Sequence, residues 1–267
     1  MAIQDEFGRV GFFEDFLGNE AAVTLTDATA GARWNDILLT GISGDVAMTF
    51  TVDEPGGVAA FSGAAGAGDG VGLVGGRFVP STMGTIAAGG RFKVSAATDY
   101  RAFLGWAETV ALAEPVNPFT LSGTTLTSND AGQAVGFYYD TGATTDDFRL
   151  HASSDGTELT TAAVKPSIDG STTLGALGIR CSMTLTADRW MIWRVEIDPD
   201  GTVRGYFGDE TMGNTLGLSH IATIAAGNID ETANYHPVMY LLEESTGDPT
   251  HEVDYFWGKG HRDWADD

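Results

Sequence analysis

Apolar and polar residues alternate most clearly on the two sides of Pro199-Asp200-Gly201. Proline presets φ for a turn, and glycine can take the left-handed conformation that a three-residue hairpin loop requires. The pattern therefore predicts a β-hairpin in which Glu196 lies opposite Arg204 on a polar face. The other face is apolar and is predicted to hold Trp193, Val195, Ile197, Val203 and Phe207.

The same short alternation continues through the chain, and helical periodicity is nearly absent. Breaks that contain glycine recur about every ten residues, which is typical of an all-β sandwich or barrel. Strands are predicted at residues 11–17, 45–52, 57–61, 90–96, 100–107, 134–139, 147–152, 190–198, 202–207, 216–224, 236–243 and 252–258. About a dozen strands is too many for an immunoglobulin-type domain and suits two large packed sheets.

The segments between the strands define the expected domain organisation. Three of them are rich in glycine or proline and are predicted to be long loops, namely residues 63–76, 111–119 and 121–132. No segment resembles a linker, and 267 residues is an ordinary length for one large all-β domain. We expect a single sandwich over residues 11–258, with an N-terminal arm at residues 1–10 and a C-terminal tail at residues 259–267.

The charge balance and the cysteine content exclude several classes of protein. There are 14 basic and 37 acidic residues, a net charge of -23, so the clustered cations of a nucleic-acid-binding protein are absent. No run reaches the roughly 20 apolar residues of a membrane span. Residues 1–6 lack the basic start and apolar run of a secretory signal, so we expect neither membrane insertion nor secretion by that route. Cys181 is the single cysteine and is predicted to be a small buried side chain.

Both ends of the predicted sandwich carry a resemblance to a known fold. Phe12-Phe13-Glu14-Asp15-Phe16-Leu17-Gly18 resembles the first strand of the concanavalin A-like lectin/glucanase jelly roll, and Glu252-Val253-Asp254-Tyr255-Phe256 resembles its last strand. The resemblance implies a jelly-roll sandwich of two large antiparallel sheets. The order of the segments between them is similar to that of jelly-roll proteins from tailed-bacteriophage virions, with matches at residues 56–60, 91–94, 103–106 and 135–140.

The catalytic signature of the laminarinase-type members of this fold is incomplete here. Those enzymes carry a Glu-x-Asp-x-x-Glu motif on one strand. A retaining mechanism requires its two outer carboxyl groups to lie about 5 Å apart. In this chain Glu196-Ile197-Asp198 is followed by Gly201 where the acid/base should stand. We therefore expect no enzyme, and glycoside hydrolase or polysaccharide lyase is the least favoured function. Glu196 is instead predicted to be the exposed partner of Arg204.

The resemblance also implies two kinds of binding site. A structural calcium ion joins the first and last strands in the related enzymes, and the matching positions are Glu14, Asp15 and Asp254. The alternative is that these acids only solvate a sheet edge. A glycan-binding cleft on the concave sheet would use exposed aromatic rings, with Trp106 and Tyr138 as the candidates. Other aromatic residues that could line it are Trp34, Tyr139 and Trp257. The alternative is that these rings fill the core.

Two functions follow as hypotheses. The first is a non-enzymatic structural protein of a bacteriophage virion, a decoration protein on the head exterior that binds the major capsid protein and forms homo-oligomers. The alternative is a lectin-like glycan-binding protein or a tail-associated receptor-binding protein, whose partner is a cell-surface glycan. Neither requires a cofactor beyond the structural calcium.

Overall fold

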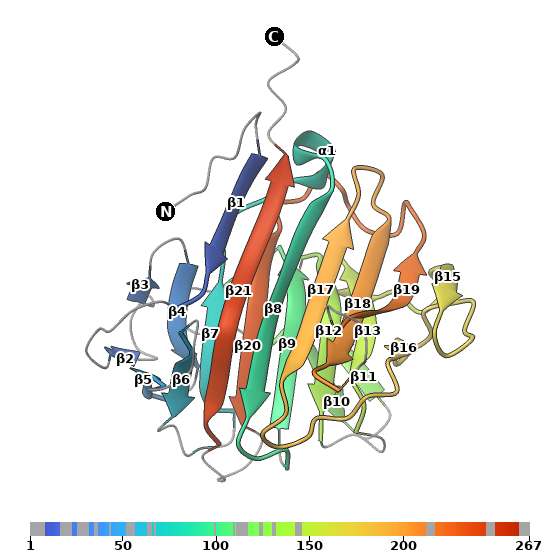
Figure 1. The fold of residues 1–267 in the computed structure, drawn as a ribbon. Coiled ribbons are helices and arrows are strands. Elements are labelled where there is room, and N and C mark those ends of the chain that lie inside the picture. Colours follow the sequence, from blue (N-terminus) through green and yellow to red (C-terminus); the bar gives the residue numbers. More distant parts are fainter. Residues whose placement is uncertain are drawn as a thin grey trace.

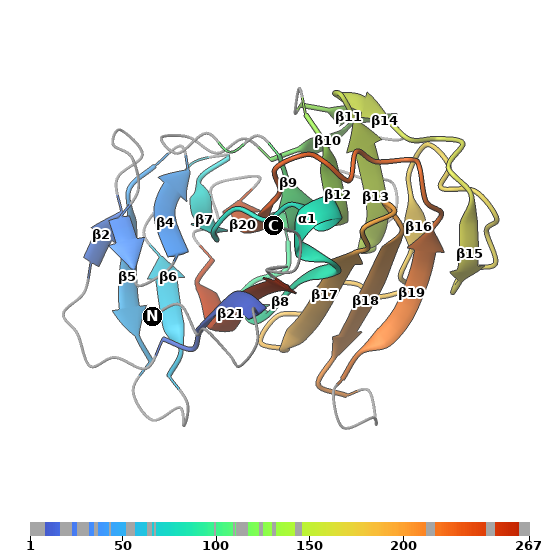
Figure 2. The ribbon, with the colours of Figure 1, turned by 90° about the horizontal axis from the view of Figure 1, so that it is seen from above.

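The computed structural model describes residues 9–16, 23–25, 32–34, 37–42, 44–51, 57–62, 66, 68–98, 100–108, 110, 117–122, 125–129, 132–141, 146–211, 217–243 and 249–261. Within these residues nearly all regular structure is β, as predicted, and the strands form two large antiparallel sheets packed face to face (Figures 1 and 2). One four-residue helix, α1 (Pro80–Met83), caps one end. No helix in this part of the chain has the length and hydropathy to cross a membrane.

The first sheet contains ten of the described strands. Its order is β15 (Val164–Ser167), β19 (Ser219–Ile224), β18 (Val203–Asp209), β17 (Met191–Ile197), β8 (Ile86–Val94), β21 (His251–His261), β6 (Ala59–Ser62), β5 (Val46–Phe50) and β2 (Val23–Leu25), with β1 (Arg9–Glu14) paired to β21. We call this the ten-stranded sheet. Figure 1 shows it in front, with β1 and β21 lying side by side.

The second sheet contains nine of the described strands. Its order is β14 (Thr157–Glu158), β13 (Arg149–Ser154), β12 (Ala134–Asp140), β9 (Tyr100–Ala107), β20 (His236–Glu243), β7 (Gly70–Val74), β4 (Ile37–Ile42) and β3 (Ala32–Trp34), with β16 (Ile179–Arg180) paired to β13. The remaining two described strands, β10 (Phe119–Ser122) and β11 (Thr125–Ser128), form a separate hairpin. This two-sheet jelly-roll sandwich is the fold that the sequence predicts.

The hairpin around Gly201 has the predicted register. Glu196 pairs with Arg204, and Gly201 has a φ of 78°, the left-handed conformation expected of it. The loop closes with a hydrogen bond of 2.8 Å from the Asp198 N–H to the Thr202 carbonyl. The five predicted apolar side chains are all buried: Trp193, Val195, Ile197, Val203 and Phe207.

The C-terminal boundary differs from the prediction. β21 continues through Lys259 to His261, three residues into the segment expected to be a tail, because β1 pairs with residues 256–261. Arg9 pairs with His261, so β1 also begins inside the expected N-terminal arm. The rest of the arm and of the tail lies outside the described residues.

Two of the predicted loops contain strands. β7 lies inside residues 63–76 and is a central strand of the nine-stranded sheet, and β11 lies inside residues 121–132. β7 has the glycine-rich composition of a loop, but Gly70 is required by close packing. A Cβ atom at Gly70 would overlap the carbonyl oxygen of Leu241 in the neighbouring strand. Of the predicted loop at 111–119, residues 111–116 lie outside the described residues.

The main core fills the space between the two sheets and is rich in aromatic rings. Phe207 contacts Phe137 and Phe148, with ring centroids 5.0 Å and 4.4 Å apart. Trp106 lies edge-on to Phe78 at 5.5 Å. Cys181 is buried in the same cluster, as predicted, and this burial raises the pKa of its thiol. Such packing of large rings between sheets fixes their separation and orientation.

Candidate functional site

The outer face of the nine-stranded sheet is covered by the chain itself. Figure 2 shows β10 and β11 lying outside β12 and β13. Phe119 of β10 packs on Phe103 and Tyr138, with ring centroids 5.6 Å and 6.0 Å apart. Leu121 and Leu126 are buried in the same cluster. The hairpin therefore covers the outer face over β9, β12 and β13, where the exposed aromatic platform was predicted.

The two predicted sugar-stacking residues are core residues. Trp106 is fully buried between the sheets, and its indole N–H donates a hydrogen bond of 3.0 Å to the Val195 carbonyl in the opposite sheet. Tyr138 is buried beneath the hairpin and donates from its hydroxyl to the Leu177 carbonyl at 2.9 Å. The prediction that they form an exposed platform is wrong, because neither ring has a face open to a ligand.

The other predicted cleft aromatics also differ from expectation. Tyr139 is buried, and the side chain of Trp34 lies outside the described part of the molecule. Trp257 is partly exposed, but it belongs to β21 and therefore lies on the ten-stranded sheet. An exposed aromatic surface does exist, on the opposite side of the sandwich from the one expected.

His151 is a buried imidazole beneath the hairpin. It has no exposed surface, and neither ring nitrogen has a hydrogen-bond partner. Phe119 lies 5.2 Å away edge-on and Tyr138 lies 6.3 Å away, measured between ring centroids. Burial lowers the pKa of His151 from 6.5 to about 3, because the charged imidazolium would lose its hydration there. The folded protein therefore holds this side chain neutral.

This burial predicts a loss of stability in mild acid. Below pH 6.5 the unfolded chain binds a proton at His151 that the folded chain takes up only near pH 3. The free energy of unfolding should therefore fall as the pH drops from 6.5 towards 3, by about 2 kcal/mol at pH 5. The measurement is urea denaturation of the wild type and of His151→Phe at pH 7 and pH 5. The variant should lose less stability than the wild type between the two pH values.

The control for this experiment is His261→Phe, at the exposed end of β21. It should show the same difference between pH 7 and pH 5 as the wild type. Every ionisable group other than His151 is common to the wild type and His151→Phe, so the comparison isolates the buried imidazole. An identical pH dependence in the wild type and in His151→Phe would contradict a neutral, buried His151.

Two of the three predicted calcium ligands use their carboxylates in contacts with other residues of the protein. The carboxylate of Glu14 accepts a hydrogen bond of 2.9 Å from the Phe16 N–H, and Asp254 forms an ion pair of 2.6 Å with Arg91. Asp15 is partly exposed. Across the described residues, no group of three or more His, Cys, Asp and Glu side chains could hold a metal ion. The arrangement thus gives the predicted calcium site no support.

The Glu-Ile-Asp run forms an ion-pair cluster. Glu196 contacts both Arg194 and Arg204, and Arg204 also donates to Asp198 at 2.6 Å. These hydrogen bonds raise the pKa of Arg204, Asp198 contributing most. The pairing of Glu196 with Arg204 is confirmed, but the expected exposure is wrong, because Glu196 is buried among these guanidinium groups. Its carboxylate is committed to binding two cations.

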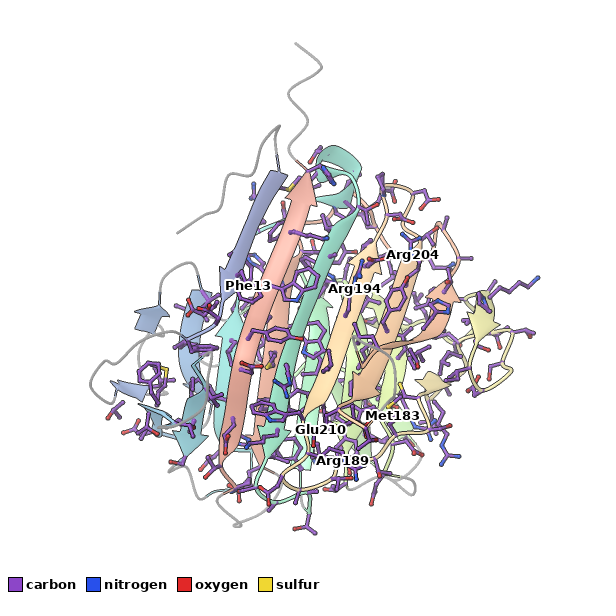
Figure 3. All side chains as sticks on the ribbon, viewed as in Figure 1. Phe13, Met183, Arg189, Arg194, Arg204 and Glu210 are labelled. Atoms are coloured by element: carbon purple, nitrogen blue, oxygen red, sulfur yellow. The ribbon has the colours of Figure 1, made fainter. Side chains whose placement is uncertain are left out.

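A row of six residues, five of them with large side chains, crosses the outer face of the ten-stranded sheet. Each member lies directly opposite the next in the strand register. We call this the cross-strand row, and from β1 to β19 it consists of Phe13, Trp257, Gly89, Arg194, Tyr206 and His220. Figure 3 views this face and shows Phe13 at one side and Arg194 near the middle.

The members of the row pack on one another and remain accessible. Phe13 is 52% exposed and stacks on the neighbouring Tyr255 at 5.8 Å with an interplanar angle of 22°. The indole of Trp257 lies against Gly89, where a Cβ atom would come within 2.9 Å of the ring. At the other end the Tyr206 ring lies between two basic side chains, with the Arg194 guanidinium 5.4 Å away and the His220 ring 5.3 Å away.

The sequence carries a signal for this surface in its first and last strands. In β21 the alternation places Tyr255 and Trp257 on the outer side of the sheet and Phe256 on the inner side. Outward positions on an exposed sheet face are usually held by polar residues. Phe13 stands in the same relation to Phe12 in β1. Aromatic residues at outward positions of both terminal strands indicate an exposed aromatic surface there.

The comparisons with known proteins identify a fold rather than a family. No protein-family model matches the chain, and no curated protein matches its sequence. A solved structure of SO2946, a protein of unknown function from Shewanella oneidensis MR-1, aligns with a TM-score of 0.57 at 11% identity, covering 100% of this chain and 92% of that one. Two plant lectins align over most of their length at lower TM-scores.

Lectin I from Ulex europaeus, solved with the methyl glycoside of α-L-fucose, has a TM-score of 0.49 at 10% identity, covering 90% of this chain and 98% of the lectin. Peanut lectin has a TM-score of 0.46 at 10% identity, covering 94% and 97%. The strand order and the two sheets define the class of the molecule, a concanavalin A-like jelly-roll sandwich.

Proposed function

We propose that this protein is a non-enzymatic carbohydrate-binding protein and that it binds through the outer face of the ten-stranded sheet. The cross-strand row is the observation that carries the proposal. Aromatic faces pack against the C–H faces of sugar rings, and the paired charges beside them can exchange hydrogen bonds with hydroxyl groups. Phe13, Trp257 and Tyr206 supply the rings, while Arg91–Asp254 and Arg194–Glu196 supply the charges.

The outer face of the nine-stranded sheet is less suited to binding than that of the ten-stranded sheet, because the β10–β11 hairpin covers it. Binding over β9 and β12 would require the β10–β11 hairpin to leave its place, which would expose Phe119 and Leu121 to water. Exposing apolar side chains costs about 25 cal/mol for each square ångström of apolar surface. The ten-stranded sheet needs no such rearrangement, since Phe13 is already exposed.

The capsid-decoration hypothesis rests on the sequence alone: on the order of its segments, its acidic composition, and the lack of a secretory signal and of a catalytic motif in it. No feature of the fold and no comparison supports a major capsid protein as partner or a virion as location, whereas the fold is one that known lectins share. We therefore prefer the carbohydrate-binding alternative. Homo-oligomer formation stays a prediction from the sequence.

The proposal predicts that Trp257 contributes to glycan affinity. Trp257→Ala should weaken the binding of a glycan selected from a broad panel by about ten-fold, because it removes the central stacking ring. Trp257→Phe, which keeps an aromatic face, should retain most of the affinity. The measurement is isothermal titration calorimetry, with the thermal unfolding midpoint of each variant as a check on folding.

A control variant on the other side of the sandwich is Thr127→Ala. Thr127 is exposed on β11, outside the nine-stranded sheet. The proposal expects it to bind like the wild type. Lost affinity in Thr127→Ala together with normal affinity in Trp257→Ala would contradict it, as would a complete lack of binding across the panel.

A further inference from the structure

We propose that the ligand is an extended, uncharged polysaccharide whose chain crosses the strands along the cross-strand row. This inference rests on the proposed function and adds the class of ligand and its direction. It is argued from the length of the row, from the low profile of its centre and from the pairing of the charges around it.

The row is long enough for several sugar units. Its six positions lie on six neighbouring strands, from β1 to β19. Strands in a sheet are about 4.8 Å apart, so five spacings give a length of about 24 Å. An extended chain of pyranose rings advances by a similar distance per unit. One sugar would cover only a fraction of the row, and an oligomer of about five units would cover it fully.

The centre of the row is low, which suits a chain that lies flat. Gly89 has no side chain, and the Trp257 indole lies against its backbone. On the same side of β8, two residues away in either direction, lie Ala87, which is small and buried, and Arg91, whose guanidinium is 4.4 Å from the Trp190 ring. Trp257 and Arg194 flank Gly89 in the row, and beyond them lie Phe13 at one end and Tyr206 with His220 at the other. A chain that lies flat on the Trp257 indole at Gly89 can reach both ends of the row.

The charges favour an uncharged chain. Lys259 of β21 is exposed on this face, with its ammonium 5.6 Å from the Trp257 ring. Four other basic side chains are each held by a carboxylate: Arg91 by Asp254, Lys93 by Glu252, Arg194 by Glu196, and Arg204 by both Glu196 and Asp198. Their positive charge is already compensated, and the whole chain carries a net charge of -23. A polyanion would be repelled at long range, while hydroxyl groups can still bond to the ion pairs.

The experiment measures affinity as a function of chain length. The probes are glucose and unbranched β-1,4- and β-1,3-linked gluco-oligosaccharides up to about eight units, longer than the row, with polygalacturonate as the charged counterpart. We expect affinity to rise at least ten-fold from the dimer to an oligomer of about five units and then to level off. Polygalacturonate should bind more weakly than the uncharged oligomers at low salt.

Variants at the two ends of the row provide the sharper readout. Phe13→Ala and His220→Ala should each weaken binding of the longest oligomers several-fold while leaving the dimer unaffected. Thr127→Ala is the matched control and should affect neither. Loss of affinity for long chains alone is a signature that misfolding does not produce, because misfolding would weaken the binding of short and long probes together.

Three results would overturn the inference, and they are distinguishable from a failure of the proposed function. Equal affinity for glucose and the longest oligomer, or tighter binding of polygalacturonate, would refute the extended uncharged chain while leaving carbohydrate binding intact. Binding of panel monosaccharides but of no unbranched oligosaccharide would do the same. If no glycan binds and Phe13→Ala instead converts an oligomer to a monomer in sedimentation, the face joins copies of this chain and both proposals fail.

Discussion

Trp106→Ala should lower the free energy of unfolding by about 3–5 kcal/mol, the range for removing a large buried aromatic side chain. Trp106 is fully buried between the sheets, lies edge-on to Phe78 and bonds to the Val195 carbonyl of the opposite sheet. The alanine variant loses this packing and also leaves the carbonyl without its donor. The measurement is equilibrium denaturation in urea at neutral pH.

Two variants serve as controls for this experiment. Trp106→Phe keeps an aromatic ring and loses chiefly the hydrogen bond, so it should cost less than half as much. Phe13→Ala, at a side chain that is 52% exposed, should cost less than about 1 kcal/mol. If Trp106→Ala kept its full stability and lost glycan affinity instead, Trp106 would be the stacking residue first predicted, and our placement of it would be wrong.

Gly70→Ala should be similarly damaging, although it adds only one methyl group. The new Cβ atom would overlap the Leu241 carbonyl oxygen, which belongs to the backbone of a paired central strand and cannot turn aside. We expect a loss of about 3 kcal/mol or more, at the upper end of the range for overpacking. Thermal and chemical denaturation both report this loss.

Gly76→Ala is the matched control, six residues further along the same segment. A Cβ atom there meets nothing within 4 Å, and the residue is exposed. Its effect should stay within about 0.5 kcal/mol. Equal stability of the two variants would show that β7 does not pack against β20 as described.

The parts of the fold that the sequence predicts well are those with local signals. The hairpin around Gly201 combines turn residues with alternation on both sides, so its register follows without knowledge of the rest of the molecule. The resemblance at the two ends predicts their proximity, which the pairing of β1 with β21 shows. β7 was missed because its glycines, which are required by the close approach of β20, give the composition of a loop.

The misplaced glycan residues have a common physical cause. Every residue of β12 is buried, because the core covers one face of the strand and the β10–β11 hairpin covers the other. In such a strand the alternation of polar and apolar residues disappears, so the sequence cannot tell which of Tyr138 and Tyr139 faces outward. Only the position of the hairpin shows that neither reaches the solvent.

The cross-strand row could not be found as a unit from the sequence. Its members come from six separate strands, from Phe13 in β1 to Trp257 in β21, and they meet only through the registers of five strand pairs. The alternation in each strand gives the side on which a residue lies, but it does not give its neighbour across the sheet. That information is tertiary.

The most direct test of the account is a crystal structure of the protein with the tightest-binding oligosaccharide from the length series. The account predicts a chain lying across β21, β8, β17 and β18, with sugar rings against Trp257 and Tyr206 and with the β10–β11 hairpin in its present place. An oligosaccharide bound over β9 and β12, with that hairpin displaced, would contradict it.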